Sequence, residues 1–105
     1  MGTPKGAKTD WTFNSLPTIL ATILPGQLGR FYRAYNNGGG DECWEWKGPR
    51  DSDGGRFYWN YQHRQRVVSA SRLAYYLITR KDLGKEKVRH TCGNNLCMNP
   101  AHLEI

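Results

Sequence analysis

The chain has 105 residues, which corresponds to one domain with a small hydrophobic core. Its 15 Lys and Arg against 9 Asp and Glu leave a net charge of +6, which favours a polyanionic partner, most simply nucleic acid. The apolar run 16–24 is too short, and too interrupted by Pro17, to span a bilayer, which argues against a membrane partner. Three cysteines with no signal peptide before them indicate a reducing cytosol and thiolates that bind metal.

Residues 1–10 are small, polar and basic, and this composition predicts a disordered arm that lies against phosphates or is simply a solvated terminus. Apolar residues over 11–35 recur at helical spacing, which predicts core-facing helical segments with a break at Pro25. The glycine-rich loop 36–40 ends this N-terminal helical segment, 11–40, without starting a second domain.

The middle of the chain predicts a sheet. Aromatic and polar side chains alternate over 43–47 and over 56–61, which is the period of a half-buried strand. The intervening stretch 48–55 is rich in Gly and Asp and predicts a turn. A second turn around His63 leads to a third predicted strand over 65–70, so we expect a short antiparallel sheet.

A helix is predicted after the third strand. Ser69 or Ser71 can cap it, its apolar pattern runs to about Arg80, and Gly84 closes the helical region. A helix beside an antiparallel sheet makes residues 11–105 a single α+β domain, with the sheet, this helix and a metal-binding loop inside 43–105.

The end of the chain carries the pattern His-x-Cys-x4-Cys-x4-His, which is typical of a zinc knuckle. Zinc(II) takes four thiolate or imidazole ligands in a tetrahedron, and Cys92, Cys97 and His102 supply three of them. Cys43 is the only other cysteine, so it is the predicted fourth ligand. This assignment leaves His90 unligated at a strand end. The alternatives are ordinary buried cysteines, a core histidine, or a site in which His90 replaces His102.

Four stretches of the chain follow one another in a characteristic order. They are Cys43-Trp-Glu-Trp-Lys-Gly, Gly55-Arg-Phe, Ser71-Arg-Leu-Ala-Tyr and Val88-Arg-His-Thr-Cys-Gly-Asn-Asn-Leu-Cys-Met-Asn-Pro-Ala-His-Leu103. In this order they resemble the HNH endonucleases common in phages. The resemblance covers about Phe31 to the C-terminus and is closest to the zinc-bearing His-Cys box branch of the His-Me finger (ββα-metal) superfamily, which includes many homing endonucleases. It implies a cytosolic DNA nuclease in the phage or bacterial host.

The resemblance assigns roles by position. His90 matches the general base that takes a proton from the water attacking a DNA phosphodiester. Arg56 matches an arginine that contacts the scissile phosphate, a role for which Arg64 and Arg66 compete. The four zinc ligands would be structural, with no part in the chemistry. The arginines expected to contact DNA are Arg50, Arg56, Arg64, Arg66 and Arg89.

The chain departs from the family pattern at its end. In the family a helix follows the position of 103–105, and an Asn on that helix binds the catalytic divalent ion, usually Mg²⁺. The chain ends at Ile105, so we expect an incomplete ββα-metal finger whose Mg²⁺ ligand lies outside it. Asn94, Asn95 and Asn99 inside the knuckle are expected to shape turns rather than to bind the ion.

Two functional classes follow from the sequence. The first is a metal-dependent DNA endonuclease of homing type, acting as a homodimer or with a complementing C-terminal fragment. The second is a zinc-stabilised module that binds DNA without cutting it, with the Arg- and aromatic-rich ribbon 56–66 in a groove. A domain that binds an acidic protein through its positive charge is a third alternative.

Overall fold

In this computed structural model the described residues are 9–12, 14–35, 38, 40–83 and 86–105. The helices are α1 (Leu16–Ala21), α2 (Pro25–Arg33), α3 (Ala70–Thr79) and the 3-10 turn η1 (Pro100–His102). The strands are β1 (Thr9–Asp10), β2 (Arg50–Asp51), β3 (Gly54–Tyr61), β4 (Arg64–Ser69), β5 (Arg89–His90) and β6 (Leu103–Glu104). These elements form the small α+β fold that the sequence predicts.

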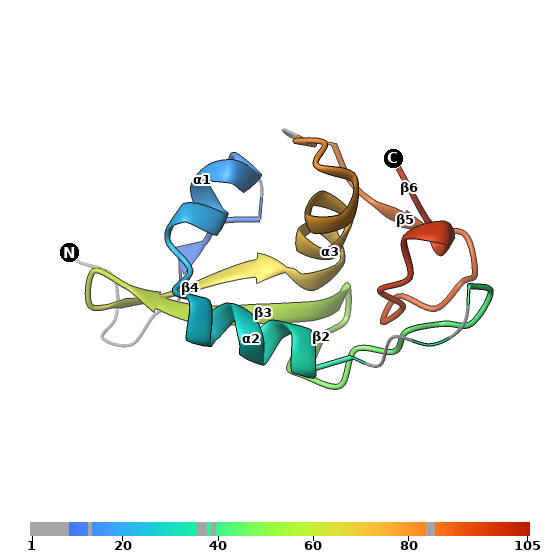
Figure 1. Cartoon of the computed structure of the whole chain (residues 1–105), viewed down its shortest axis with the longest axis horizontal. Coiled ribbons are helices and arrows are strands. Elements are labelled where there is room, and N and C mark those ends of the chain that lie inside the picture. Colours follow the sequence, from blue (N-terminus) through green and yellow to red (C-terminus); the bar gives the residue numbers. More distant parts are fainter. Residues whose placement is uncertain (1–8, 13, 36–37, 39, 84–85) are drawn as a thin grey trace.

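A four-stranded sheet in the order β1-β4-β3-β2 forms the centre of the fold, and β5 and β6 form a separate pair. The β3–β4 hairpin confirms the strands predicted at 56–61 and 65–70, and its turn places both Gln62 and His63 in the left-handed region, at φ 52° and 62°. The C-terminal elements lie with residues 40–49 at one end of the molecule, away from α1 (Figure 1).

The predicted strand 43–47 is wrong. This segment does not join the sheet and makes only isolated bridges, between Tyr35 and Trp46 and between Glu45 and Cys97. Its backbone hydrogen bonds go to the C-terminal loop on one side and, from the N–H of Lys47 to the carbonyl of Ala34 at 2.6 Å, to the end of α2 on the other. The Trp46 ring is buried in the core. The predicted turn 48–55 also contains β2, which pairs with the start of β3.

The N-terminal part differs from the predicted arm. Residues 9–10 form β1, parallel to β4, and the backbone N–H of Trp11 continues this pairing with a 2.7 Å bond to the carbonyl of Val67. The remainder of the predicted arm, 1–8, falls outside the described residues. Residues 9–10 are thus ordered rather than disordered, because the edge of β4 offers backbone groups with which they pair.

Both N-terminal helices form where the apolar spacing predicts them. Pro25 is the first residue of α2 rather than a break outside it, because the first helical position needs no N–H donor. Leu24, expected in the core, is 66% exposed just before α2. Most of the predicted loop 36–40 falls outside the described residues.

Of the two candidate caps for the helix after the third strand, Ser69 is the cap, and its side chain accepts a hydrogen bond from the backbone N–H of Arg72. α3 ends at Thr79, and Arg80 takes the left-handed conformation typical of a helix C-terminus. The predicted closing residue Gly84 falls outside the described residues.

Aromatic rings dominate the core. Phe31 of α2 meets the edge of Phe57 of β3 at 5.3 Å between centroids and lies 5.2 Å from the Trp46 ring. Trp59 packs edge-on against Trp11 at 5.9 Å. These ring contacts pack the N-terminal segments against the β3–β4 hairpin. The packing fixes the position of the hairpin edge that lies beside the candidate site.

We expect Gly55→Ala to destabilise the protein by about 2–3 kcal/mol. A Cβ at Gly55 would lie 2.6 Å from Cδ1 of Trp46, and this ring cannot swing away because it is 2% exposed and donates a 2.8 Å hydrogen bond to the carbonyl of Pro49. Urea denaturation measures the loss. Gly26→Ala, with nothing within 4 Å of its Cβ, is the control, and an equal effect of both changes would contradict the steric cause.

Candidate metal centre and the adjoining pocket

Backbone pairing brings the distant Cys43 to the C-terminal loop. The N–H of Trp46 donates to the carbonyl of Leu96 at 2.8 Å, and the N–H of Met98 donates to the carbonyl of Trp44, also at 2.8 Å. These two hydrogen bonds lie on either side of Cys97 in a short antiparallel pairing. Cys43, which precedes the paired segment, therefore lies beside Cys97. The segment predicted as a strand of the sheet therefore serves to assemble the metal centre.

The four predicted zinc ligands converge, with their ligand atoms all within 4.8 Å of one another. The sulfurs of Cys43 and Cys92 are 3.6 Å apart, and Nδ1 of His102 lies 3.6 Å from the sulfur of Cys43 and 3.4 Å from that of Cys97. A tetrahedral zinc site separates two sulfurs by about 3.8 Å and a sulfur from an imidazole nitrogen by about 3.5 Å.

These separations are too long for a disulfide, whose sulfurs are about 2.05 Å apart. The chemistry of the donor set and its spacing therefore fit a zinc ion held by Cys43, Cys92, Cys97 and His102.

The surroundings of the centre act differently on two of its thiols: they raise the pKa of Cys43 and lower that of Cys92. Hydrogen bonds with Cys97 and then Cys92, together with burial and their negative charge, raise the pKa of Cys43 to about 12. A divalent cation reverses this preference of Cys43 for its proton, because it stabilises thiolates directly and releases their protons on binding.

Asn99 connects the backbone just before Cys43 to the turn that carries His102. Its amide Nδ2 donates to the carbonyls of Gly40 at 2.9 Å and Glu42 at 2.6 Å, while its Oδ1 accepts from the N–H of Ala101 at 2.9 Å. Asn99 is 2% exposed. It fixes the approach to Cys43 and caps the turn that carries His102, so it has the turn role expected from the sequence.

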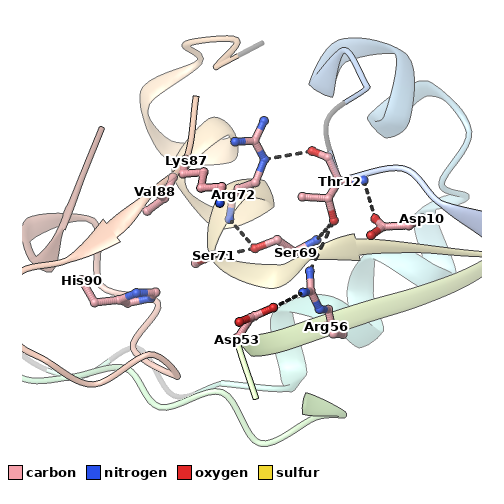
Figure 2. A pocket seen from close by; sticks show the side chains of 10 residues that line it. All are labelled: Asp10, Thr12, Asp53, Arg56, Ser69, Ser71, Arg72, Lys87, Val88 and His90. Atoms are coloured by element: carbon pink, nitrogen blue, oxygen red, sulfur yellow. Dashed lines mark hydrogen bonds and ion pairs between the residues drawn. The ribbon is translucent and has the colours of Figure 1, made fainter. Parts of the chain in front are cut away.

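A pocket of about 410 Å³ adjoins the metal centre. Figure 2 shows the side chains that line it, with the imidazole of His90 pointing inward from one wall and Arg56 on the opposite wall. Its lining residues are Asp10, Thr12, Asp53, Arg56, Ser69, Ser71, Arg72, Lys87, Val88 and His90. Three permanent cations against two carboxylates make the pocket suited to an anion.

His90 lies outside the metal-ligand group and at the end of β5, where β6 pairs with it. The N–H of Thr91 donates to the carbonyl of His102 at 2.8 Å, so the turn that carries His102 holds the backbone next to His90. Burial lowers the pKa of His90, and a hydrogen bond to the backbone carbonyl of Cys97 opposes this only in part. Its Nε2 is buried and has no hydrogen-bond partner among the described residues. A neutral imidazole can accept a proton at such a nitrogen when water enters beside it.

Arg56 is held on the opposite wall by neighbours on three sides. Its Nε donates to Oδ2 of Asp51 at 2.7 Å, its Nη1 donates to Oγ1 of Thr12 at 3.4 Å, and its Nη2 lies 3.8 Å from the carboxylate of Asp53. The hydrogen bond from Arg56 lowers the pKa of Asp51. With its side chain 16% exposed, Arg56 presents an oriented guanidinium to the pocket.

The other arginines predicted to contact DNA differ in their surroundings. Arg50 on β2 and Arg64 at the hairpin turn are exposed. Arg89 is exposed and pairs with Glu104 at 2.6 Å. Arg66 is only 8% exposed, because its guanidinium lies over the rings of Trp11 and Tyr61 at 5.0 and 5.9 Å. This burial leaves little of Arg66 accessible to a phosphate, and its contact with DNA stays a prediction.

Sequence reasoning missed several pocket residues, among them Thr12, Arg72 and Lys87. Arg72 offered a signal, since a charged residue within the apolar pattern of α3 needs a buried partner. It is 3% exposed and its Nε donates to the carbonyl of Thr12 at 2.9 Å. Burial lowers the pKa of Arg72. Thr12 offered no signal, because it lies before the first helix in a stretch with no clear periodicity.

Comparison with protein-family models, with curated proteins and with solved structures found no match. In the described part of the chain, no helix has both the length and the apolar character needed to cross a membrane. The same residues contain no second group of three His, Cys, Asp or Glu side chains with ligand atoms close enough to hold a metal ion. The candidate metal centre and the pocket are therefore the features that bear on function.

Proposed function

We propose that the protein is a metal-dependent DNA endonuclease of HNH type, similar to the homing endonucleases of phages. The observation that carries the proposal is the pocket shared by His90 and Arg56, a proton acceptor and an oriented guanidinium on opposite walls, beside a Cys3His centre. Phosphodiester hydrolysis needs both groups, because the attacking water must lose a proton while negative charge grows on the phosphate.

In this mechanism His90 accepts the proton of the attacking water at Nε2. Its lowered pKa keeps the ring neutral and able to accept a proton at neutral pH. Arg56 donates to the phosphate oxygens through Nη2, since Nε and Nη1 are engaged by Asp51 and Thr12. The zinc bound by the Cys3His group takes no part in the reaction and holds β5 and its histidine in place.

A magnesium ion, when bound, supplies charge stabilisation at the 3′-oxygen leaving group. The described pocket offers the carboxylates of Asp10 and Asp53, and Mg²⁺ is usually bound by one or two carboxylates together with waters and substrate phosphates. We therefore propose that phosphate oxygens, water and a ligand from a complementing C-terminal segment or a second copy of the chain complete its coordination.

A nicking assay on supercoiled plasmid with Mg²⁺ tests the proposal. We expect conversion to the open circle or linear form by zinc-loaded protein, either alone or after addition of a peptide carrying the family's C-terminal helix. Cleavage only with the peptide would identify a fragment of a longer or split nuclease. No cleavage under either condition would contradict nuclease activity and leave the second candidate.

The second candidate is a zinc-stabilised module that binds DNA without cutting it. It is favoured by the net charge of +6 and by the exposed arginines Arg50 and Arg64 at opposite ends of the hairpin. A ribbon that enters a groove is less well supported, because Arg66 is buried under aromatic rings rather than available to phosphates.

Under both candidates we expect affinity for duplex DNA to fall steeply with salt, because each lysine or arginine that contacts a phosphate releases a bound counterion. Fluorescence anisotropy from about 50 to 200 mM salt measures this dependence, and Arg64→Ala should reduce the slope of log affinity against log salt by about 1. A flat response would contradict phosphate contacts. Unchanged circular dichroism of Arg64→Ala shows that its fold is kept.

A further inference from the structure

We infer that Thr12 is a positioning residue for Arg56, and that the N-terminal segment 9–12 forms a wall of the pocket in which the reaction takes place. The inference deepens the proposed nuclease function and rests on it. It concerns a segment that lies outside the stretch resembling the HNH endonucleases, and a hydroxyl group that does not itself reach the phosphate.

Thr12 is 5% exposed, and its polar groups join separate parts of the molecule. Its Oγ1 accepts hydrogen bonds from Nη1 of Arg56 at 3.4 Å and from the backbone N–H of Ser69 at 3.1 Å. Its carbonyl accepts from Nε of Arg72 at 2.9 Å, and its N–H donates to the carboxylate of Asp10 at 2.8 Å. One residue thereby connects β3, the end of β4 and α3 at the pocket wall (Figure 2).

The contact with Arg56 completes a two-point clamp. Asp51 holds Nε at 2.7 Å and Thr12 holds Nη1, so the guanidinium plane is defined by anchors at two of its three nitrogens. Nη2 then faces Asp53, whose side chain is 83% exposed and 3.8 Å away. This solvated carboxylate is the neighbour that an incoming phosphate can displace, whereas the two anchors stay in place.

Thr12 itself is held by the pairing of its segment with the sheet. β1 pairs with β4, the next backbone N–H, of Trp11, donates to Val67, and the Trp11 ring packs against Trp59 and Tyr61 at 5.9 and 6.0 Å. Because the indole is anchored in the aromatic core, the residue that follows it is brought to the pocket in a defined place. The segment is therefore part of the site and not an arm beside it.

Thr12→Val removes Oγ1 at nearly constant volume, and Thr12→Ser keeps it, so this pair isolates the hydroxyl group. In zinc-loaded protein we expect Thr12→Val to lower the plasmid nicking rate at saturating DNA by about 10- to 100-fold, while Thr12→Ser stays within about 3-fold of wild type. The DNA dissociation constant should change less than the rate. Thr18→Val, an exposed threonine on α1, is the matched control and should behave as wild type.

A second measurement does not depend on cleavage. The Arg56 Nε–H signal in ¹⁵N NMR, assigned by its loss in Arg56→Lys, should show a heteronuclear NOE close to that of the backbone in wild type and in Thr12→Ser, and a lower one in Thr12→Val. An ordered signal that becomes mobile in Thr12→Val supports the inference even if the wild type cuts no DNA, which would overturn only the nuclease proposal.

The inference is overturned if Thr12→Val cleaves as fast as wild type, or if Thr12→Ser loses as much activity as Thr12→Val while both stay folded. It is also overturned if the Arg56 signal is already mobile in the wild type, a result that does not depend on either Thr12 variant. Melting temperature and zinc content are measured for each variant. If Thr12 has only a structural effect, these two quantities fall, but the serine and valine variants cleave at the same rate per folded molecule.

Discussion

Replacing Cys97 with serine is expected to release zinc and to unfold most of the domain. Cys97 is fully buried, its sulfur lies 3.4 Å from Nδ1 of His102, and its backbone pairs with Glu45. Structural zinc sites contribute about 10–16 kcal/mol of apparent binding energy, comparable to the whole stability of about 5–15 kcal/mol of a domain. A loss of even about 4 kcal/mol lowers the melting temperature by about 15–30 °C.

Thermal circular dichroism with elemental analysis of zinc measures this effect, and a strong chelator should reproduce it in the wild type. Natively purified protein should contain zinc in equimolar amount, bound by Cys43, Cys92, Cys97 and His102. Protein without zinc, or a chelated protein with an unchanged melting curve, would remove the basis of the metal centre. Addition of zinc to the chelated wild type should restore the original curve, and addition to Cys97→Ser should not.

His90→Ala is expected to lower the rate of DNA cleavage by about 10²- to 10⁴-fold, the usual contribution of a general base. Zinc content should stay the same, because His90 lies outside the ligand group, and stability should fall by only about 1 kcal/mol for a half-buried ring. The contrast with Cys97→Ser separates the histidine that reacts from the residues that hold the metal.

His63→Asn is the matched control for this histidine. His63 is exposed in the hairpin turn at φ 62°, a conformation that asparagine tolerates, so the change removes an imidazole without straining the turn. Its nicking rate should equal that of the wild type. If His90→Ala releases zinc, the division between ligand and base is wrong, and if it cleaves DNA at the wild-type rate, another group accepts the proton.

The four residues of the candidate metal centre could be identified from the sequence because the chemistry of metal ligands is specific. Few residue types bind zinc, three of the ligands lie within one short segment, and Cys43 was the only cysteine left to complete a tetrahedron. The hairpin and α3 were also predictable, since each repeats its apolar residues with the period of a strand or a helix. The same reasoning failed at 43–47, where alternation predicted a strand of the sheet.

That failure has a physical reason. Alternation reports that one side of a segment is buried, and Trp46 is indeed 2% exposed, but it does not report which segment supplies the backbone partner. The partner is the loop around Cys97, about fifty residues away in the chain and in no regular strand. Arg66 shows the same limit, because its charge predicts exposure while two aromatic rings bury it.

What the sequence by itself determined is the set of groups with distinctive local chemistry, namely the four soft ligands, the histidine they leave over, and the periodic segments that build the hairpin and α3. Only the tertiary structure decided that Arg56 faces His90 across a pocket and that Thr12 orients Arg56 from the N-terminal segment. Local periodicity encodes how much of a side chain is buried. The meeting of single polar side chains from distant segments depends on how those segments pack, and no local pattern records it.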